Sequence, residues 1–263
     1  MDTERYQEIN ARTVDAWVEG GWVWGVPISH EEFARAQAGD WRILLTPTKS
    51  VPQAWFAPYL RNGRLDGVRI LGLASGGGQQ MPILSALGAC CTVLDYSQKQ
   101  LDSEQLVAQR EGYEIDIVRG DMTQRLPFAD ASFDLIIHPV SNCYVEDVYH
   151  VWNECFRVLK AGGVLLAGMD NGINFLFDEV GEGEPLVVAN ALPFNPLKDP
   201  ALMEKLMRDG DGVQFSHTME EQVGGQLKAG FLLAGLYEDR DAEGPISRVS
   251  PQYIATRAIK PGA

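Results

Sequence analysis

The chain is short of several features that would indicate particular classes of protein. Its 263 residues include only 4 Cys and 4 His, and 22 Lys and Arg face 36 Asp and Glu, which gives a net charge of −14. Lys and Arg dominate binding to nucleic-acid phosphates and to anionic membrane surfaces, so neither is expected as a partner. No run approaches the roughly 18 apolar residues of a membrane span, and no secretory signal is visible at residues 1–5.

The spacing of cysteine and histidine argues against a metal centre. The cysteines form no C-x-x-C pair, and two of them adjoin within an apolar stretch, which indicates buried, reduced thiols and a cytoplasmic protein. The histidines form no H-x-x-x-H pair, so no metal is expected. The sequence leaves the oligomeric state open. The cysteines are Cys90, Cys91, Cys143 and Cys155, and the histidines are His30, His138, His150 and His217.

From residue 68 onward, short apolar runs alternate with helical patterns. We expect strands at 68–74, 91–95, 114–118, 133–138, 164–168, 231–237 and 253–258, and helices at 79–87, 97–111, 148–159 and 219–228. This alternation predicts an α/β fold, a Rossmann-like seven-stranded, mostly parallel sheet with helices on both faces. The last two strands lack a helix between them, so an antiparallel pair is expected at the sheet edge.

The length suits one large domain with additions. Residues 1–66 are expected to form an N-terminal helical cap or lid, in which Ser29 and Glu32 have the spacing of a capping box. Residues 67–263 would form the α/β domain. Residues 171–215 interrupt its rhythm with four prolines, which indicates an insertion that could close over a site.

A glycine-rich turn follows the first strand. The run from Ala74 to Gly78 precedes a helix, where glycine lets the backbone approach a ligand and the helix offers free N–H groups. Asp95 ends the second strand, and a carboxylate there can accept hydrogen bonds from both ribose hydroxyls. A nucleophile elbow is excluded by Leu73, a P-loop by Gln79, and a dinucleotide fingerprint starting at Gly76 by Met81.

Together with Gly120-Asp121, Pro127-Phe128 and the run 157–163, these motifs resemble the class I S-adenosylmethionine-dependent methyltransferases, especially the small-molecule enzymes of quinone biosynthesis. The resemblance covers about residues 65–170, with weaker support to 258. It implies that Asp95 holds the ribose, Asp121 accepts from the adenine amino group, the Met122 N–H meets the ring and Gly76 lies under the methionine. The residues expected to contact this cofactor are Ala74, Ser75, Gly76, Gly78, Gln79, Asp95, Tyr96, Asp121, Met122 and His138.

One position departs from the family pattern. Members usually carry an acid in the first strand, which helps to hold the cofactor's ammonium group, but here that position is Gly72. The first glycine of the turn is likewise replaced, by Ala74. The ammonium would then depend on Gln79 or Gln80, on the backbone at 138–139, or on the N-terminal cap.

The segment after the fourth strand carries the candidate catalytic groups. A general base helps when the methyl acceptor is a hydroxyl or thiol, and His138 is the first candidate and Tyr144 the second. The alternative is that His138 only satisfies backbone groups and Tyr144 packs. The residues expected to contact substrate are Trp22, Trp24, Asn142 and Asp170, although the tryptophans could equally be packing.

Three functions remain open at this point. The leading one is an enzyme that transfers the methyl group of S-adenosylmethionine to an enclosed, partly apolar small molecule, where an acidic lining would attract an amine. The second is a non-catalytic S-adenosylmethionine sensor or accessory protein. The third is an NAD(P)-dependent oxidoreductase, which shares the sheet and Asp95.

Overall fold

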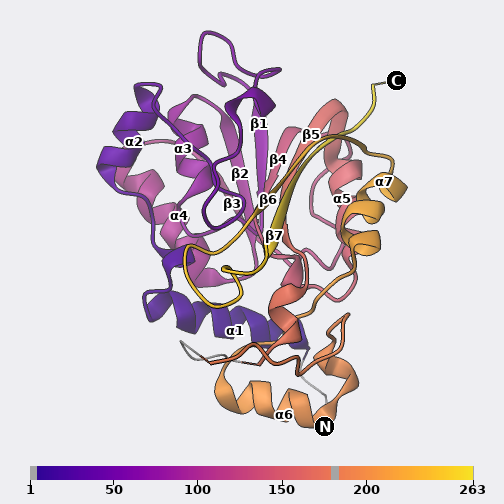
Figure 1. The fold of residues 1–263 in the computed structure, drawn as a ribbon. Helices are drawn as coiled ribbons and strands as arrows, with labels where there is room; N and C mark the ends of the chain where they lie inside the picture. Colours follow the sequence, from indigo (N-terminus) through magenta and orange to yellow (C-terminus); the bar gives the residue numbers. More distant parts are fainter. Residues whose placement is uncertain (1–4, 179–183, 263) are drawn as a thin grey trace.

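The computed structural model describes residues 5–178 and 184–262, which fold around one seven-stranded sheet (Figure 1). The strands are β1 (Arg69–Leu73), β2 (Cys90–Asp95), β3 (Asp116–Arg119), β4 (Phe133–His138), β5 (Leu159–Asp170), β6 (Leu232–Asp239) and β7 (Tyr253–Ile259). The α-helices are α1 (Tyr6–Glu19), α2 (His30–Gln37), α3 (Gln80–Ala86), α4 (Gln98–Glu111), α5 (Val148–Val158), α6 (Pro200–Asp209) and α7 (Gly225–Ala229). Shorter helical turns are η1 (Val23–Gly25), η2 (Gln53–Trp55), η3 (Asn142–Tyr144), η4 (Ile173–Leu176), η5 (Pro196–Lys198) and η6 (Glu220–Gly224).

The strand order β3-β2-β1-β4-β5-β7-β6 confirms the predicted Rossmann-like fold. Strands β1 to β5 are parallel, whereas β7 runs antiparallel to both of its neighbours, β5 and β6. The last two strands therefore pair antiparallel at the edge, as predicted, with β7 as the reversed strand and β6 outermost. The chain moves outward from β1 to β3 and then returns to β4. The crevice between the carboxyl ends of β1 and β4 is the switch point where ligands bind in such sheets.

Alternate residues of each strand enter two different apolar layers. Ile70 and Leu135 pack with α2, α3 and α4, while Leu71 and Ile136 pack with α5. Figure 1 shows these helices on opposite sides of the sheet. The predicted apolar stripe of α5 is buried throughout, which anchors this helix on its face of the sheet. Its buried members are Val148, Val151, Trp152, Cys155 and Val158.

The segment before β1 shares the core of the sheet. Phe33 and Phe56 are buried in the same cluster as Ile70. The predicted capping box of α2 is present, because the Ser29 hydroxyl accepts from the Glu32 N–H and Glu32 accepts from the Ser29 N–H. The segment is helical only in part, since residues 38–52 form no helix and include an isolated antiparallel bridge between Leu44 and Ser50.

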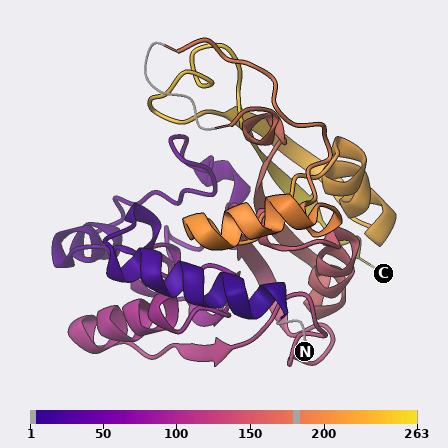
Figure 2. The ribbon, with the colours of Figure 1, turned by 90° about the horizontal axis from the view of Figure 1, so that it is seen from below.

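Two segments far apart in the sequence lie together beyond the carboxyl ends of the strands. Figure 2 shows α6 beside α1. Ile9 of α1 forms a small buried cluster with Val213 and Phe215, and Met203 of α6 packs against it. The buried Asn10 amide donates to the Val213 carbonyl at 2.9 Å and accepts from its N–H at 2.6 Å. The N-terminal helix and the expected insertion are thus joined; residues 179–183 of that insertion lie outside the described residues.

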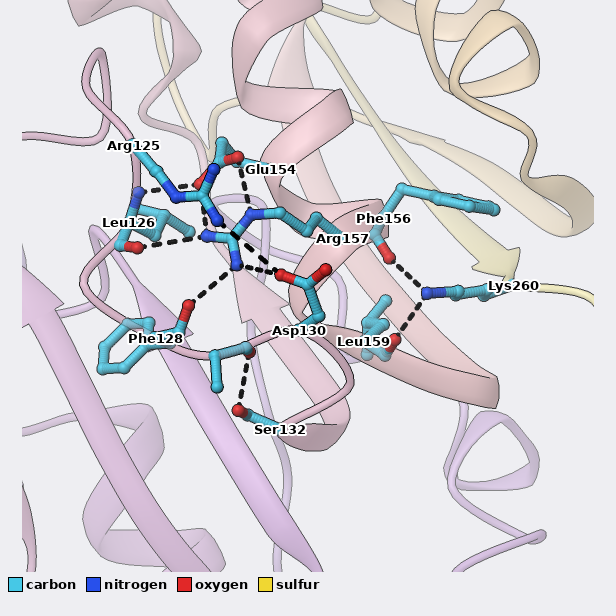
Figure 3. Close-up of polar contacts among 11 residues, drawn as sticks. Arg125, Leu126, Phe128, Asp130, Ser132, Glu154, Phe156, Arg157, Leu159 and Lys260 are labelled. Atoms are coloured by element: carbon cyan, nitrogen blue, oxygen red, sulfur yellow. Dashed lines mark hydrogen bonds and ion pairs between the residues drawn. The ribbon is translucent and has the colours of Figure 1, made fainter.

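A polar network holds the chain where α5 ends and β5 begins, at the end of the sheet that faces away from the crevice (Figure 3). Arg157 donates to the carbonyls of Leu126 and Phe128 and pairs with Glu154 and Asp130. Lys260 donates to two carbonyls at the end of α5, those of Phe156 and Leu159. Such contacts satisfy carbonyls that a helix end leaves without partners. The run 157–163 therefore holds the α5–β5 junction, away from the crevice.

Two element boundaries differ from those expected. Strand β5 begins at Leu159 rather than near Val164, and the expected helix 219–228 is divided into the wide turn η6 and the short helix α7. No helix within residues 5–178 and 184–262 combines the length and apolarity needed to cross a bilayer. The same residues contain no group of three or more His, Cys, Asp or Glu arranged to hold a metal ion.

Candidate active site

The turn after β1 is shaped by its glycines. Ala74 has a φ of 47°, and Gly77 and Gly78 have φ of 95° and 69°, all in the left-handed region that favours glycine. A Cβ on Gly76 would lie 2.6 Å from the Gln100 Cβ and 2.9 Å from an Asp95 carboxylate oxygen. The turn therefore lies directly against β2 and α4, which brings its backbone beside the end of β2.

Asp95 is held in place by backbone donors. Its carboxylate accepts from the Gly76 N–H at 3.1 Å and from the Ser97 N–H at 3.0 Å. Burial nevertheless dominates and raises the pKa of Asp95 to about 6. Ser97 caps α4, because its hydroxyl accepts from the Gln100 N–H. Asp95 thus remains at the strand end with its carboxylate lining the crevice.

Two cavities meet at Asp95. The larger has a volume of about 460 Å³ and the smaller about 80 Å³. Both are lined by Val14 of α1, by Ala74 and by Asp95 and Tyr144. A carboxylate between a small and a large compartment matches a nucleoside ligand, with its ribose at the junction, its base on one side and its remaining part on the other.

The smaller cavity gathers the residues expected around adenine. Tyr96, Asp121 and Met122 line it, and α1 covers it. The Asp121 carboxylate accepts from the Thr123 N–H and hydroxyl at 2.8 and 2.7 Å, and pairs with Arg5 at 2.8 Å. The N-terminal segment therefore contacts the carboxylate that the resemblance assigns to the adenine amino group.

The larger cavity extends from the glycine turn to the ends of β5 and β7. It includes Trp22 and Trp24, and Trp22 packs on Trp17 with ring centres 5.4 Å apart. The lining residues that the sequence indicated are Trp22, Trp24, Ala74, Ser75, Gly76, Gln79, Gln80, Asp95, Tyr144 and Asp170. Those it missed include Leu44, Leu45, Thr46, Pro47, Asn174, Gln214, Asp241 and Tyr253.

Met81 occupies the space next to Gly72, where the family carries an acid. A Cβ at Gly72 would lie 2.8 Å from the Met81 sulfur, so a larger side chain there would require Met81 to move. Gln79 and Gln80 line the cavity, but their amides are engaged. Gln79 donates to carbonyls of 23 and 26, and Gln80 donates to Leu44 and accepts from the Ser75 hydroxyl. Both glutamines fasten the N-terminal segment to the turn.

The structure does not bring His138 to the cavity. The side chain is fully buried, with Nδ1 2.8 Å from the Leu73 carbonyl and Nε2 2.8 Å from the Asn142 side-chain oxygen. The Asn142 amide in turn donates to Gln222 of η6. Burial lowers the pKa of His138. His138 and Asn142, expected as base and substrate ligand, instead form a buried polar chain, because strand alternation turns His138 to the face that α5 covers.

Two polar groups, one after β4 and one at the end of β5, do line the cavity. Burial raises the pKa of Tyr144 well above its ordinary value, so the phenol stays protonated at neutral pH and can donate a hydrogen bond. Asp170 is 3% exposed, and one of its oxygens accepts from the Gly172 N–H at 2.9 Å. Its Oδ2 has no hydrogen-bond partner among the described residues, and burial raises the pKa of Asp170 to about 6.

Asp241 and Tyr253 reach the cavity because β7 is reversed. The amino end of β7 lies at the same edge as the carboxyl ends of the other strands, where Tyr253 pairs in register with Asp170. The predicted antiparallel pair was the available signal for these residues.

Comparison with known proteins agrees with this geometry. A family described as "Methyltransferase domain" matches residues 71–167. An uncharacterized methyltransferase of Bacillus subtilis, YbaJ, is 40% identical over 254 residues, which cover 95% of this chain and 97% of that protein. The chain belongs to the class I S-adenosylmethionine-dependent methyltransferases. This membership decides for methyl transfer over the oxidoreductase alternative and makes S-adenosylmethionine the cofactor.

Other relatives of this methyltransferase match more narrowly. A ubiquinone biosynthesis O-methyltransferase of Maricaulis maris is 26% identical over 55% of this chain and 59% of its own length. An S-adenosylmethionine-dependent methyltransferase of Mesorhizobium loti has the same fold, with a TM-score of 0.59 and 20% identity over 79% of this chain and 96% of that chain. The methyltransferase thus shares the sheet with many proteins, while 1–66 and 171–215 lie outside the matched family domain.

Proposed function

We propose that this methyltransferase transfers the methyl group of S-adenosylmethionine to a small molecule enclosed in the larger cavity. The observation that carries the proposal is the pair of connected cavities, which α1, the aromatic segment at 22–24 and the segment after β5 close together. A volume of about 460 Å³ suits the methionine part of the cofactor and an acceptor of modest size. In this division, the cap (1–66) and the insertion (171–215) contribute to substrate choice and the domain 67–263 holds most of the cofactor, while α1 of the cap also covers the smaller cavity.

In this proposal the cofactor lies across the carboxyl ends of β2, β1 and β4. Asp95 accepts from the ribose hydroxyls, and Asp121 and the Met122 N–H contact adenine. The turn from Ala74 to Gly78 borders the methionine part. The three carboxylates of the larger cavity favour its cationic groups, since no lysine, arginine or histidine is among the described residues that line it.

The chemistry requires mainly alignment and exclusion of water. The nucleophile attacks the methyl carbon in line with the departing sulfur, whose C–S bond breaks with its electron pair to give the neutral thioether. Because the sulfonium is already activated, the contribution of the enzyme is to hold both partners in the reacting geometry. The cavity between α1 and the segment after β5 would bring both partners together in that geometry.

Transfer of labelled methyl groups tests the proposal. The enzyme is incubated with methyl-labelled S-adenosylmethionine and a cell extract separated by size into small molecules, protein and nucleic acid. We expect label in the small-molecule fraction, and Asp95→Ala should reduce cofactor affinity about 100-fold, because two hydrogen bonds to a carboxylate are lost. Asp116→Ala, an exposed change on β3, is the matched control. Label in protein or nucleic acid would overturn the proposal.

A further inference from the structure

The far end of the larger cavity holds a second set of carboxylates, away from Asp95. Asp170 ends β5, and Asp241 follows β6. Because neighbouring strands are about 4.8 Å apart, the end of β5 lies about 10 Å from β1 and about 14 Å from β2. The cofactor site described above extends over β2, β1 and β4, so Asp170 is one strand beyond it, on the acceptor side.

One carboxylate oxygen of Asp170 has no hydrogen-bond partner among the described residues. The side chain is 97% buried, and only Oδ1 has a partner, the Gly172 N–H. Oδ2 accepts no hydrogen bond from any described residue, although Asp170 lines the cavity. A buried, unpaired carboxylate oxygen costs free energy, and a donor brought by the ligand would recover it.

Asp241 is fixed beside it by a polar cluster. The Asp241 carboxylate accepts from the Gln252 amide at 2.9 Å and from the Tyr253 hydroxyl at 3.2 Å. Asn174 donates to the same Tyr253 hydroxyl at 3.3 Å and accepts from the Gln252 amide at 3.1 Å. These bonds hold Asp241 at the cavity wall, while Tyr253 pairs in register with Asp170.

The charges at this end select the chemistry of the acceptor. Among the described residues that line the cavity, none is lysine, arginine or histidine, so none of these lining residues supplies a positive charge to Asp170 or Asp241. An acceptor that placed a carboxylate or phosphate here would be repelled, whereas a neutral hydroxyl would balance neither charge. A protonated nitrogen supplies both the donors and the positive charge. Phe175 and the tryptophans 22 and 24 offer apolar and cation–π surface for the rest of such a molecule.

We propose that Asp170, assisted by Asp241, binds the protonated amine of a small-molecule acceptor and that this nitrogen receives the methyl group. The inference rests on the function proposed above. Asp170 takes one proton from the ammonium, and the neutral amine then attacks the methyl carbon. The C–N bond forms as the C–S bond breaks with its electron pair to sulfur. The products are a methylated ammonium and S-adenosylhomocysteine, and Asp170 later releases its proton to water.

A binding experiment uses three compounds with one skeleton. The enzyme saturated with S-adenosylhomocysteine is titrated with 2-phenylethylamine, 2-phenylethanol and phenylacetate, and thermal shifts give apparent affinities. We expect the amine to bind at least about tenfold more tightly than the alcohol or the acid. Asp170→Asn should remove that preference, since Asn can keep the bond from Gly172 but lacks the charge. Asp178→Asn, exposed on the same segment, should retain it.

The outcomes distinguish a failure of the amine assignment from a failure of the proposed methyl transfer to a small molecule. Equal binding of amine and alcohol, or an unchanged preference in Asp170→Asn, overturns the amine assignment. Weaker binding of S-adenosylhomocysteine to Asp170→Asn would show that the carboxylate serves the cofactor, which also overturns it. If Asp170→Asn fails to fold, Asp241→Asn should show the same loss of preference.

The labelled product gives a second readout. A methylated amine is retained on a cation exchanger at pH 7, whereas a neutral or anionic product passes through. A labelled small molecule that passes through overturns only the amine assignment. Label in protein or nucleic acid overturns the proposed function itself.

Discussion

Glu104 offers a stability measurement that tests how the glycine turn is supported. The side chain is fully buried on α4, and its Oε1 accepts from the Gly78 N–H at 2.9 Å. Its Oε2 has no partner among the described residues, and burial raises the pKa of Glu104 from 4.5 to about 8. The folded protein therefore holds a proton that the unfolded chain releases above about pH 4.5.

The sign and size of the effect follow from linkage. A raised pKa contributes stability that is complete below the unfolded value and is lost as the pH rises through the folded value. Between pH 6 and the folded pKa of about 8, the folded protein keeps this proton while the unfolded chain has already lost it. Over these roughly 2 pH units the free energy of unfolding therefore falls by about 3 kcal/mol. Glu104→Gln replaces the protonated acid by an uncharged group of the same shape, so this part of the pH dependence should disappear.

Urea unfolding at pH 6 and pH 9 measures the difference. The wild type should lose about 3 kcal/mol more than Glu104→Gln over this interval, because all other titrating groups are shared by the two proteins. Asp102→Asn, an exposed change on the same helix, should behave as the wild type. If wild type and Glu104→Gln lose stability in parallel, the assignment of a buried, protonated Glu104 is refuted.

Two further substitutions test the turn and the segment after β4. Ala74→Gly should raise the free energy of unfolding by about 1 kcal/mol, because glycine adopts a φ of 47° without strain; an unchanged or lowered urea midpoint would contradict this. His138→Ala should lower it by about 3 kcal/mol, since the Leu73 carbonyl and the Asn142 side chain lose their partner. The pH profile of methyl transfer should be unchanged in that variant, and loss of a titration step near neutral pH would restore His138 as a base.

The local sequence pattern was enough to predict those parts of the fold that are determined within a single helix. The stripe of α5 and the capping box of Ser29 and Glu32 could be predicted because both are determined within a single helix. The residue at which β5 begins could not be predicted from the local sequence. Its first residues pair with the chain end, where the Gly162 N–H donates to Lys260 and the Lys260 N–H donates to Gly163. Those partners are about a hundred positions away and leave no trace in the local pattern.

The residues of the site likewise divide into those that the local sequence predicts and those that depend on distant elements. Asp95 was recognisable because it follows a strand at a fixed distance from the glycine turn, and that distance is set by one strand–helix–strand unit. The placement of His138 depends on Trp152 of α5 and on the Asn142–Gln222 pair, which lie in other elements. The position of Asp241 in the site could not be predicted without the strand order of the sheet. Only the reversal of β7 brings the loop between β6 and β7 to the cavity.

The reversal of β7 also places part of the acceptor site on a different part of the sheet from the cofactor contacts. The cofactor contacts come from loops that leave β1, β2, β3 and β4, which form one half of the sheet. The acceptor end draws on the connection between β6 and β7, residues 240–252, which lies at the border of the sheet and joins two strands in a simple hairpin. Replacing that single hairpin loop would exchange Asp241 and leave Asp170 and the cofactor contacts intact, so this fold can vary one side of the acceptor site by changing one loop.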